Sequence, residues 1–222
     1  MARRRGQIAV AAGTNGAGKS SIADEFVNAT GGGYFNPDIL ARKLVAAGRA
    51  PEEANAEAWK VGFDALRRAI ARNEDFYFET TLGGRSISEE LHRAIDAGLD
   101  VRIWYVGLES PELHIERVLA RVKRGGHDIP VAKIRQRYSS SLANLVSFMG
   151  KAAEVRVFDN SRETKDGSPA ATLVLRMEGR TLVEPDRETL LRTTPQWAKP
   201  LAAAALRAGQ RARPKKTGKQ AG

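Results

Sequence analysis

The stretch Gly13-Thr14-Asn15-Gly16-Ala17-Gly18-Lys19-Ser20 decides the fold of this 222-residue chain. It follows an apolar run at residues 7–12, precedes a segment of helical period, and fits the pattern G-x-x-x-x-G-K-[ST] at every position. A glycine-rich turn with a chance lysine is the alternative. The context favours a phosphate-binding loop (P-loop) whose backbone N–H groups wrap around the phosphates of ATP. In such a loop Lys19 reaches the β- and γ-phosphates, and the Ser20 hydroxyl ligates Mg²⁺.

Apolar runs of strand length alternate with helical segments along the chain, a pattern typical of a parallel sheet covered by helices on both faces. The expected strands are residues 7–12, 33–35, 75–80, 101–108 and 155–158. The expected helices are residues 19–28, 38–47, 51–73, 86–97, 111–124 and 130–149. The sequence therefore predicts a three-layer α/β P-loop NTPase fold with a mostly parallel, five-stranded sheet.

The pattern changes after residue 160. Residues 171–177 and 180–184 flank Glu178-Gly179, which predicts a small C-terminal β-hairpin at the edge of the domain. From Pro200 an alanine-rich stretch gives way to Arg, Lys, Gly and Gln, and residues 208–222 are expected to be disordered. We therefore expect one kinase-type domain over residues 1–198 and a basic, disordered tail over residues 199–222.

The composition restricts the function classes. The chain contains no cysteine, which excludes disulfides, thiolate zinc sites and cysteine nucleophiles. No apolar run approaches the roughly 18 residues of a membrane helix, so we expect a soluble, cytoplasmic protein without a membrane partner. The formal charge of +10 comes from Arg3-Arg4-Arg5 and from seven Lys and Arg residues within 199–222, which leaves the body neutral. Basic ends on a neutral body disfavour a dedicated nucleic-acid-binding fold.

Two acidic residues are expected at the carboxyl edge of the sheet, where ligands of α/β proteins bind. Glu79 ends the apolar run at residues 76–78, and with Thr80 and Thr81 it could hold a metal-bound water or the acceptor. The alternative is an acid that caps the next helical region. Asp38 follows the short second strand and opens a helix, so it is either a helix cap or a catalytic base.

Arginines gather around a glycine pair in the second half of the chain. Arg117, Arg121 and Arg124 share one helix face, and Arg135 and Arg137 follow Gly125-Gly126 on the next helix. A charged stripe is often only solvated, but two arginine-bearing helices joined by glycines could close over phosphates as a lid. His127, beside the glycine pair, could contact phosphate or substrate. His92 and His114 are expected on ordinary helix surfaces without a role.

Several short motifs occur in a fixed order along the chain. After the P-loop come Asn36-Pro37-Asp38, Glu79-Thr80-Thr81-Leu82, Glu116-Arg117-Val118, Gly125-Gly126-His127-Asp128-Ile129-Pro130, Arg137-Tyr138 and Asp159-Asn160-Ser161. The last of these motifs is either a loop near the nucleotide base or a plain turn. The ordered set, over about residues 7–161, resembles the zeta-toxin family of P-loop kinases, in particular a short branch often labelled a predicted ATPase.

The resemblance implies a kinase that transfers phosphate from ATP to the 3′-hydroxyl of UDP-N-acetylglucosamine. By position, Lys19 and Ser20 match the family's ATP site, Asp38 its catalytic base and Glu79 an acidic residue on the substrate side. Arg117 matches the first of two arginines that stabilise the transferred phosphoryl group, and Arg121, Arg124 and Arg135 remain candidates for the second. Family members are often held by an antitoxin, so an antitoxin partner is possible.

The Gly-Gly-His-Asp-Ile-Pro segment departs from the family pattern and leaves the acceptor open. A kinase for a nucleoside, a nucleotide or a dinucleotide cofactor is one alternative. A nucleic-acid-binding NTPase that uses the basic ends is another.

Overall fold

The computed structural model describes residues 4–31, 34–126, 128–162 and 170–212. Six strands are described: β1 (Gln7–Ala12), β2 (Phe76–Thr80), β3 (Asp100–Gly107), β4 (Glu154–Asp159), β5 (Thr172–Glu178) and β6 (Thr181–Glu184). The α-helices are α1 (Ala23–Thr30), α2 (Pro37–Ala46), α3 (Pro51–Arg72), α4 (Arg85–Asp96), α5 (Pro111–Lys123), α6 (Val131–Phe148), α7 (Arg187–Thr193) and α8 (Lys199–Ala212). Two 3₁₀ helices cover Lys19–Ile22 and Gln196–Ala198.

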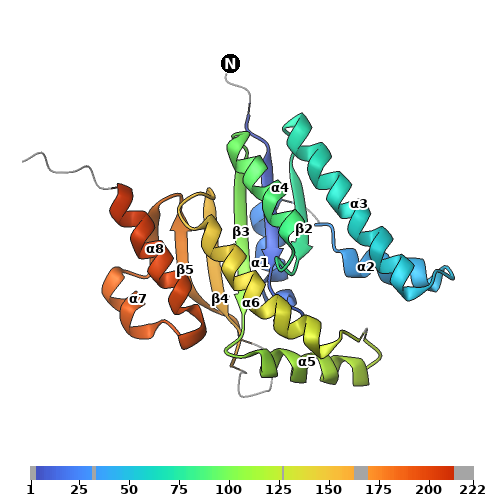
Figure 1. The fold of residues 1–222 in the computed structure, drawn as a ribbon. Coiled ribbons are helices and arrows are strands. Elements are labelled where there is room, and N and C mark those ends of the chain that lie inside the picture. The colour runs from blue at the N-terminus through green and yellow to red at the C-terminus, as the bar shows by residue number, and fades with distance from the viewer. Residues whose placement is uncertain (1–3, 32–33, 127, 163–169, 213–222) are drawn as a thin grey trace, which may run out of the picture.

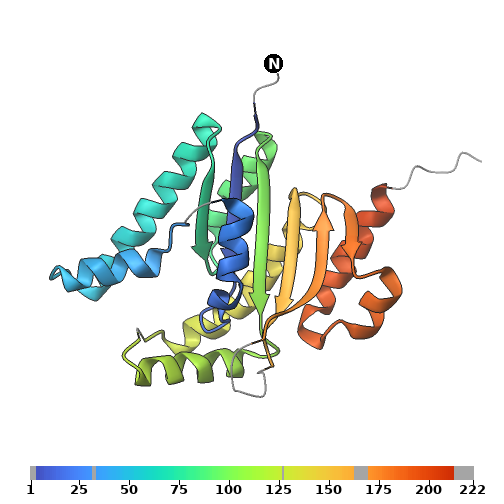
Figure 2. The ribbon, with the colours of Figure 1, turned by 180° about the vertical axis from the view of Figure 1, so that it is seen from behind.

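The sheet has the strand order β2-β1-β3-β4-β5-β6. The first four of these are parallel, and β5 and β6 continue the sheet antiparallel beyond β4. Figures 1 and 2 show α3, α4, α6 and α8 on one face of the sheet and α1 on the other, while α5 crosses below the carboxyl ends of the strands. The predicted three-layer α/β fold is confirmed, but the sheet has six strands instead of five, because both hairpin strands join it while the predicted strand at 33–35 is only an isolated bridge.

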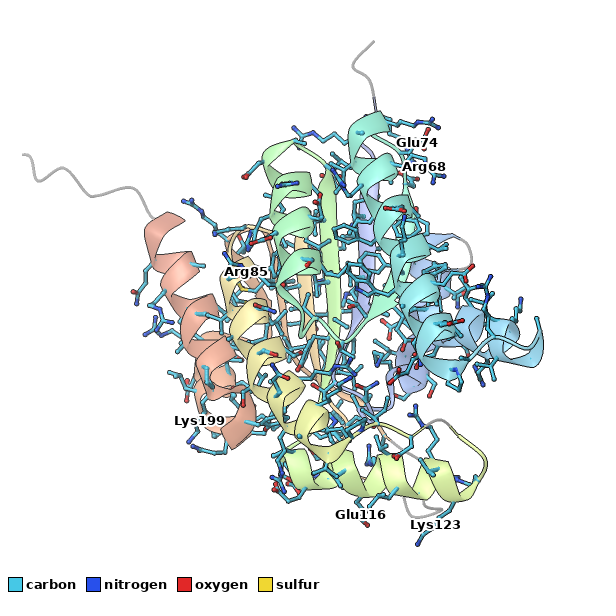
Figure 3. All side chains as sticks on the ribbon, turned by 45° about the vertical axis from the view of Figure 1, so that its right-hand side comes forward. Arg68, Glu74, Arg85, Glu116, Lys123 and Lys199 are labelled. Carbon is cyan, nitrogen blue, oxygen red and sulfur yellow. The ribbon has the colours of Figure 1, made fainter. Side chains whose placement is uncertain are left out.

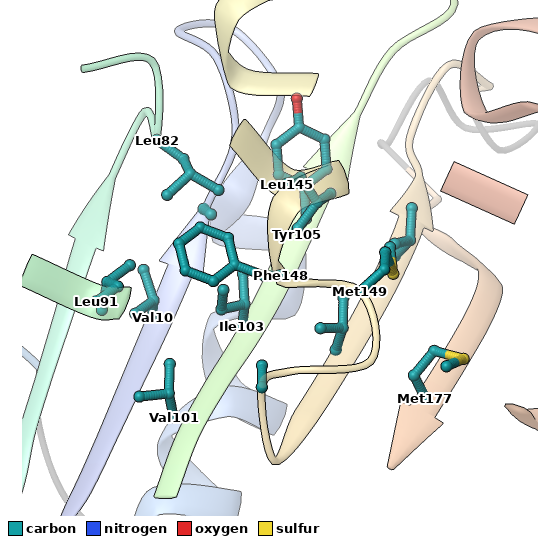
Figure 4. Packing of buried hydrophobic residues seen from close by; sticks show 14 of the residues in the cluster. Val10, Leu82, Leu91, Val101, Ile103, Tyr105, Leu145, Phe148, Met149 and Met177 are labelled. Carbon is teal, nitrogen blue, oxygen red and sulfur yellow. The ribbon is translucent and has the colours of Figure 1, made fainter. Parts of the chain in front are cut away.

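Two apolar clusters lie on the two faces of the sheet. The larger contains Leu66 of α3, Leu91 of α4, Phe148 of α6 and Leu201 of α8 against the strands. Figure 4 shows Phe148 and Leu91 packed beside Val10 and Ile103. The smaller cluster joins Ile22 and Phe26 to the far face of β1 and β3. Strands buried on both faces explain the continuous apolar runs that predicted a parallel sheet.

Helix starts follow the local signals in the sequence. The Ser110 hydroxyl accepts a hydrogen bond from the Leu113 N–H (3.2 Å), and Pro111 occupies the first position of α5. In α2 the side chain of Asn36 is the cap and Pro37 follows it. These caps fix where α2 and α5 begin, beside the carboxyl edge of the sheet.

Two predicted elements differ from the structure. The second strand, predicted at residues 33–35, is an isolated bridge from Phe35 to Phe78, and Gly33 lies outside the described residues. The predicted disorder from Lys199 onward is wrong for residues 199–212. That segment is helix α8, which buries Leu201 and Ala205 completely because its alanine-rich face packs against α6 and the sheet. Residues 213–222 of the predicted tail lie outside the described residues.

No helix in the described part of the chain has the length and apolar character needed to cross a membrane.

Candidate functional site

The P-loop lies between β1 and the 3₁₀ turn that leads into α1. Lys19 folds back so that its Nζ donates to the Gly13 carbonyl (2.9 Å) and lies 3.2 Å from Glu79 Oε1. The two side chains are only 10 % and 15 % exposed. Glu79 therefore lies beside the P-loop, as its place at the end of β2 predicted. It does not cap α4, whose first-turn cap position is Gly84.

Two glycines of the loop have no room for a side chain. Gly16 and Gly18 have φ of +82° and +78°, in the left-handed region that glycine adopts without strain. A Cβ on Gly16 would lie 2.6 Å from the His114 carbonyl oxygen, and one on Gly18 would lie 2.3 Å from Asn160 Nδ2. The loop is therefore closed from behind by α5 and by the segment after β4.

His114 supports the loop, contrary to the expectation of a surface histidine without a role. It is completely buried, and its Nδ1 lies 2.9 Å from the Asn15 carbonyl oxygen, an acceptor. Burial lowers the pKa of His114 to about 4, with the positive charges of Lys19 and Arg117 acting in the same direction. The ring is thus neutral at pH 7, with Nδ1–H donating. His92 is half-buried, stacks on Phe148 and pairs with Ser147.

Asn160 supports the other end of the loop. Its side chain is completely buried, and its Nδ2 donates to the Ala17 carbonyl (2.9 Å). The neighbouring Asp159 and Ser161 are bonded to each other, and Ser161 Oγ accepts from the Glu109 N–H (2.8 Å). The motif is therefore a turn that also fixes the P-loop, and its expected approach to the nucleotide base stays a prediction.

Arg117 lies beside the loop on α5. Both of its terminal nitrogens are buried and have no hydrogen-bond partner among the described residues, and Nη1 lies 3.9 Å from where a Cβ on Gly18 would stand. A buried guanidinium without an acceptor is costly, so this site is suited to an anion that supplies one. The residues present therefore fit a phosphate group.

The segment before α2 connects Glu79 to Asp38. Asn36 Nδ2 donates to Glu79 Oε2 (2.8 Å), and Asn36 Oδ1 accepts from the Asp38 N–H (2.9 Å). Because Asn36 is the cap, Asp38 is not needed for capping, and its side chain is exposed. A hollow of about 250 Å³ lies at the start of α2 and is lined by Tyr34, Phe35, Asn36, Ile39, Leu40 and Lys43, without Asp38.

Thr80 and Thr81 shape the turn after β2. The Thr80 hydroxyl accepts from the Leu82 N–H (3.2 Å), and the Thr81 hydroxyl accepts from the Gly83 N–H at the longer distance of 3.4 Å. The Thr80 carbonyl accepts from the Gly13 N–H (3.2 Å). Thr80 therefore lies next to the P-loop, and the hydroxyls of both threonines accept hydrogen bonds within their own turn.

The predicted lid arginines are placed differently from one another. Arg121 is half-buried on α5, one helical turn beyond Arg117. Arg124 is exposed, and its Nε donates to the carbonyl of Ala120 in the same helix (3.3 Å). Arg135 is exposed and paired with Glu112 of α5. His127 lies outside the described residues.

Figure 3 shows Glu116 and Lys123 on the side of α5 that points away from the sheet. The short distance of Arg117 from Gly18 places its side chain toward the P-loop instead.

The sequence placed Arg137 with Arg135 on the second arginine-bearing helix of the expected lid, but did not name it as a site residue. Arg137 Nη1 donates to Asn15 Oδ1 in the P-loop (2.7 Å). Burial lowers the pKa of Arg137, and the nearby Asp38 carboxylate opposes that shift. The position of Arg137 on the inner face of α6 was the available signal, because Ile134, Ser141 and Leu145 of the same helix are buried.

No cluster of three or more His, Cys, Asp or Glu side chains that could hold a metal lies within the described ranges. Mg²⁺ in a phosphate-transfer site needs only one or two protein ligands beside the phosphates and water. Ser20, exposed at the mouth of the P-loop, and Glu79 are the side chains available for this role.

Comparisons with known proteins agree with this geometry. The model of the family described as Zeta toxin matches residues 1–167. A protein of unknown function from Haemophilus influenzae is 31 % identical over 126 residues, which span 57 % of this chain and 88 % of that protein.

Two solved structures share the fold. The AvrRxo1-ORF1:AvrRxo1-ORF2 structure with ATP has a TM-score of 0.61 at 15 % identity, over 95 % of this chain and 77 % of that one. The structure of the PezAT chromosomal toxin-antitoxin system of Streptococcus pneumoniae has a TM-score of 0.53 at 14 % identity, over 95 % and 86 %. The P-loop kinase fold, the buried support of the P-loop and the family match over three quarters of its length lead to one conclusion: this chain belongs to the zeta toxin family.

Proposed function

We propose that the protein is an ATP-dependent kinase that transfers the γ-phosphoryl group to a hydroxyl of a small-molecule acceptor. The observation that carries this proposal is the continuous set of contacts from Lys19 in the P-loop through Glu79 and Asn36 to the exposed Asp38. Lys19 and the exposed Asp38 thus lie on either side of one acidic side chain, that of Glu79. Phosphoryl transfer needs this kind of positioning more than it needs covalent help from the protein.

On the donor side, the backbone of the P-loop and Lys19 would hold the ATP phosphates. Arg117 would bind the oxygens of the transferred phosphoryl group through its two unpartnered nitrogens. Ser20 and Glu79 would hold Mg²⁺, which neutralises phosphate charge when bound. The 3.2 Å ion pair of Lys19 with Glu79 keeps the lysine beside the loop before the nucleotide arrives.

On the acceptor side, Asp38 would accept the proton of the attacking hydroxyl. The hydroxyl oxygen then forms the new bond to the γ-phosphorus while the bond to the β-phosphate oxygen breaks, which releases ADP. The 250 Å³ hollow at the start of α2, with the Tyr34 and Phe35 rings and the Lys43 amine, is the surface available for the rest of the acceptor.

We propose UDP-N-acetylglucosamine as the first acceptor to test, because the family resemblance implies a sugar nucleotide. A related proposal concerns partners: the neighbour from Streptococcus pneumoniae is part of a toxin-antitoxin system, so this chain could also pair with an antitoxin.

The experiment is to incubate the protein with ATP, Mg²⁺ and UDP-N-acetylglucosamine and to follow the product by phosphorus NMR. We expect a new phosphomonoester resonance with equimolar ADP. Transfer to another metabolite in a parallel screen of nucleosides, nucleotides and dinucleotides would retain the kinase and reject the sugar nucleotide. A protein that binds ATP but transfers phosphate to none of these acceptors would reject the proposed function.

A further inference from the structure

We propose that the end of the sheet formed by β6, α7 and α8 binds an extended acidic segment of a partner protein. A hollow of about 350 Å³ lies there, lined by residues of all three elements, among them Arg180, Leu182, Arg187, Leu206 and Gly209. We call it the β6 groove. The family match ends at residue 167, so the groove belongs to the part of the chain that the family model does not cover.

The first observation is that two arginines line the groove without an acidic partner. Neither Arg180 nor Arg187 has an ion pair or a side-chain hydrogen bond with any residue that the structure describes. The acids of the hairpin are already engaged, because Glu178 and Glu184 both pair with Arg176. A guanidinium presents five N–H donors in a fork that matches a carboxylate, so each free arginine can bind one.

Asp186 is the one acidic side chain among those that line the groove. Its Oδ1 accepts hydrogen bonds from the backbone N–H groups of Thr189 (3.0 Å) and Glu188 (2.9 Å), and these bonds lower the pKa of the Asp186 carboxyl. The carboxylate therefore caps the start of α7 and pairs with neither arginine. With two guanidiniums against one carboxylate, the groove carries a net positive charge and favours anionic groups.

The second observation is an apolar floor between the charged groups. Leu182 of β6 and Leu206 of α8 are half-buried and pack against the large apolar cluster. Gly209, one turn further along α8, keeps the groove open. A Cβ there would meet only the Arg180 carbonyl oxygen within 4 Å, at the ordinary contact distance of 3.6 Å. A ligand that carries an apolar side chain beside its acids would use both the floor and the arginines.

The third observation is that β6 is the last strand of the sheet and has one neighbouring strand, β5. Figure 2 shows the hairpin in orange at this end of the sheet, next to α7 and α8. Among the described residues, none outside β5 makes a hydrogen bond to the backbone of β6. An edge strand presents N–H and C=O groups to which an extended peptide can add. The groove therefore offers backbone, apolar and charged contacts together.

The position of the two arginines specifies the occupant. Arg180 directly precedes β6, and Arg187 follows three positions after its last residue. Alternate side chains of a strand share one face, and the strand rises about 3.3 Å per residue. A segment with the pattern acid-x-apolar-x-acid thus brings two carboxylates toward the two ends of β6 and an apolar side chain toward the floor. The chain's own residues 213–222 have the wrong charge, because they contain four Arg and Lys residues and no acid.

Calorimetry with two peptides of identical composition tests the proposal on the full chain. In acetyl-Thr-Glu-Thr-Leu-Thr-Glu-Thr-amide, the acids and the leucine share one face of a strand. In acetyl-Glu-Thr-Thr-Leu-Thr-Thr-Glu-amide, the leucine faces away from the acids. We expect the first peptide to bind at least about tenfold more tightly than the second. Equal affinities would reveal only a general attraction to a basic protein and would overturn the proposal, as would the absence of binding at about 1 mM peptide.

Variants of the groove locate the bound peptide. Arg180→Met and Arg187→Met should each weaken the first peptide by about tenfold, because each removes one charged hydrogen-bonding partner. Gly209→Leu should fill the groove and weaken binding further, with a melting temperature near that of the wild type. Arg207→Met is the matched control, because Arg207 is exposed on α8 and does not line the groove. A loss for Arg207→Met as large as those for the two groove arginines would overturn the proposal.

Hydrogen exchange separates strand addition from charge attraction. We expect the bound peptide to slow exchange of backbone amides within residues 181–184 by at least about tenfold, because these amides gain hydrogen bonds. Unchanged exchange would overturn the addition of the peptide to β6.

Two further outcomes would assign the surface differently. β6 lies four strands from β1, or about 20 Å across the sheet, so we expect the peptide and ATP to bind independently. Competition between them would place the peptide at the P-loop and overturn the proposal. Sedimentation should show the chain without peptide as a monomer at the concentrations used. A dimer that Arg180→Met dissociates would assign the groove to a second copy of the chain and overturn the proposed partner.

Discussion

The P-loop and the start of α2 lie at the same edge of the sheet but differ in how firmly the fold holds them. Thr14, Asn15 and Ala17 are buried, and side chains from α5, α6 and the segment after β4 contact the loop from behind. At the start of α2, by contrast, Asp38 is exposed and Ile39 is 45 % exposed beside an open hollow. The proposed donor half of the site is preorganised, whereas the proposed acceptor half leaves room for substrates of different shape.

This difference explains why nucleotide binding is easier to infer than the acceptor. In a preorganised site the side chains already hold the positions that the ligand requires, so the ligand can be inferred from the contacts of the free protein. An open site does not, and its substrate has to be found by experiment.

Lys19→Ala tests the donor half and should have the largest effect. Lys19 is the one P-loop side chain that contacts both the loop backbone and Glu79. Without its charge near the β- and γ-phosphates, we expect ATP-dependent transfer to fall by about 10³-fold or more. Steady-state kinetics measure the loss, with Lys60→Ala on the exposed face of α3 as the control. Retention of a tenth of the wild-type rate would contradict the preorganised donor site.

Asp38→Asn tests the acceptor half and should have the next largest effect. A positioned general base contributes about 10²–10⁴-fold, so we expect kcat to fall by about 10²-fold while the affinity for ATP stays within about twofold. The cap of α2 is unchanged because Asn36 provides it, so the melting temperature should not move. Near-normal turnover in this variant would mean that a group other than Asp38 accepts the proton of the acceptor. The start of α2 would then not be the acceptor half of the site.

His114 tests how much the buried support of the P-loop depends on a neutral imidazole. Its pKa is lowered to about 4 in the folded protein, while an unfolded histidine titrates near 6.5. Between these values the unfolded chain binds the extra proton, so stability is lost as pH falls through this window. We expect the wild type to lose about 2 kcal/mol of unfolding free energy between pH 7 and pH 5 from this group alone.

The measurement is urea denaturation at the two pH values for the wild type and for His114→Gln, whose amide can still donate to the Asn15 carbonyl. The difference in pH dependence between the two proteins isolates the histidine. Equal pH dependence would show that His114 titrates normally and that the support of the loop is looser than its burial indicates.

Much of the fold could be predicted because its signals are local. Pro37, Pro51 and Pro111 occupy the first positions of helices, and the apolar runs of β1 and β3 follow from burial on both faces. The P-loop could be recognised because the backbone conformation of this eight-residue loop requires glycine at fixed positions. The position of Glu79 beside the P-loop could be predicted because ligands of α/β proteins bind at the carboxyl ends of parallel strands.

The rest depends on contacts between distant parts of the chain. His114 and Arg137 are separated from Asn15 by 99 and 122 positions, and no local pattern indicates that either faces it. Helix α8 was misread for a related reason. Its basic composition suggests a solvated tail, and only the packing of Leu201 and Ala205 against the sheet reveals that the segment is part of the core.

The antiparallel extension of the sheet also affects how the protein can be divided. The family match ends at residue 167, before β5, β6 and α8. A chain cut there would leave the outer edge of β4 without its hydrogen-bonded neighbour and would expose the apolar side chains that α8 covers. Unpaired edges of this kind recruit strands from other molecules and lead to aggregation. The region that matches the family is therefore shorter than the smallest piece that we expect to fold, and fragments for expression should extend through residue 212.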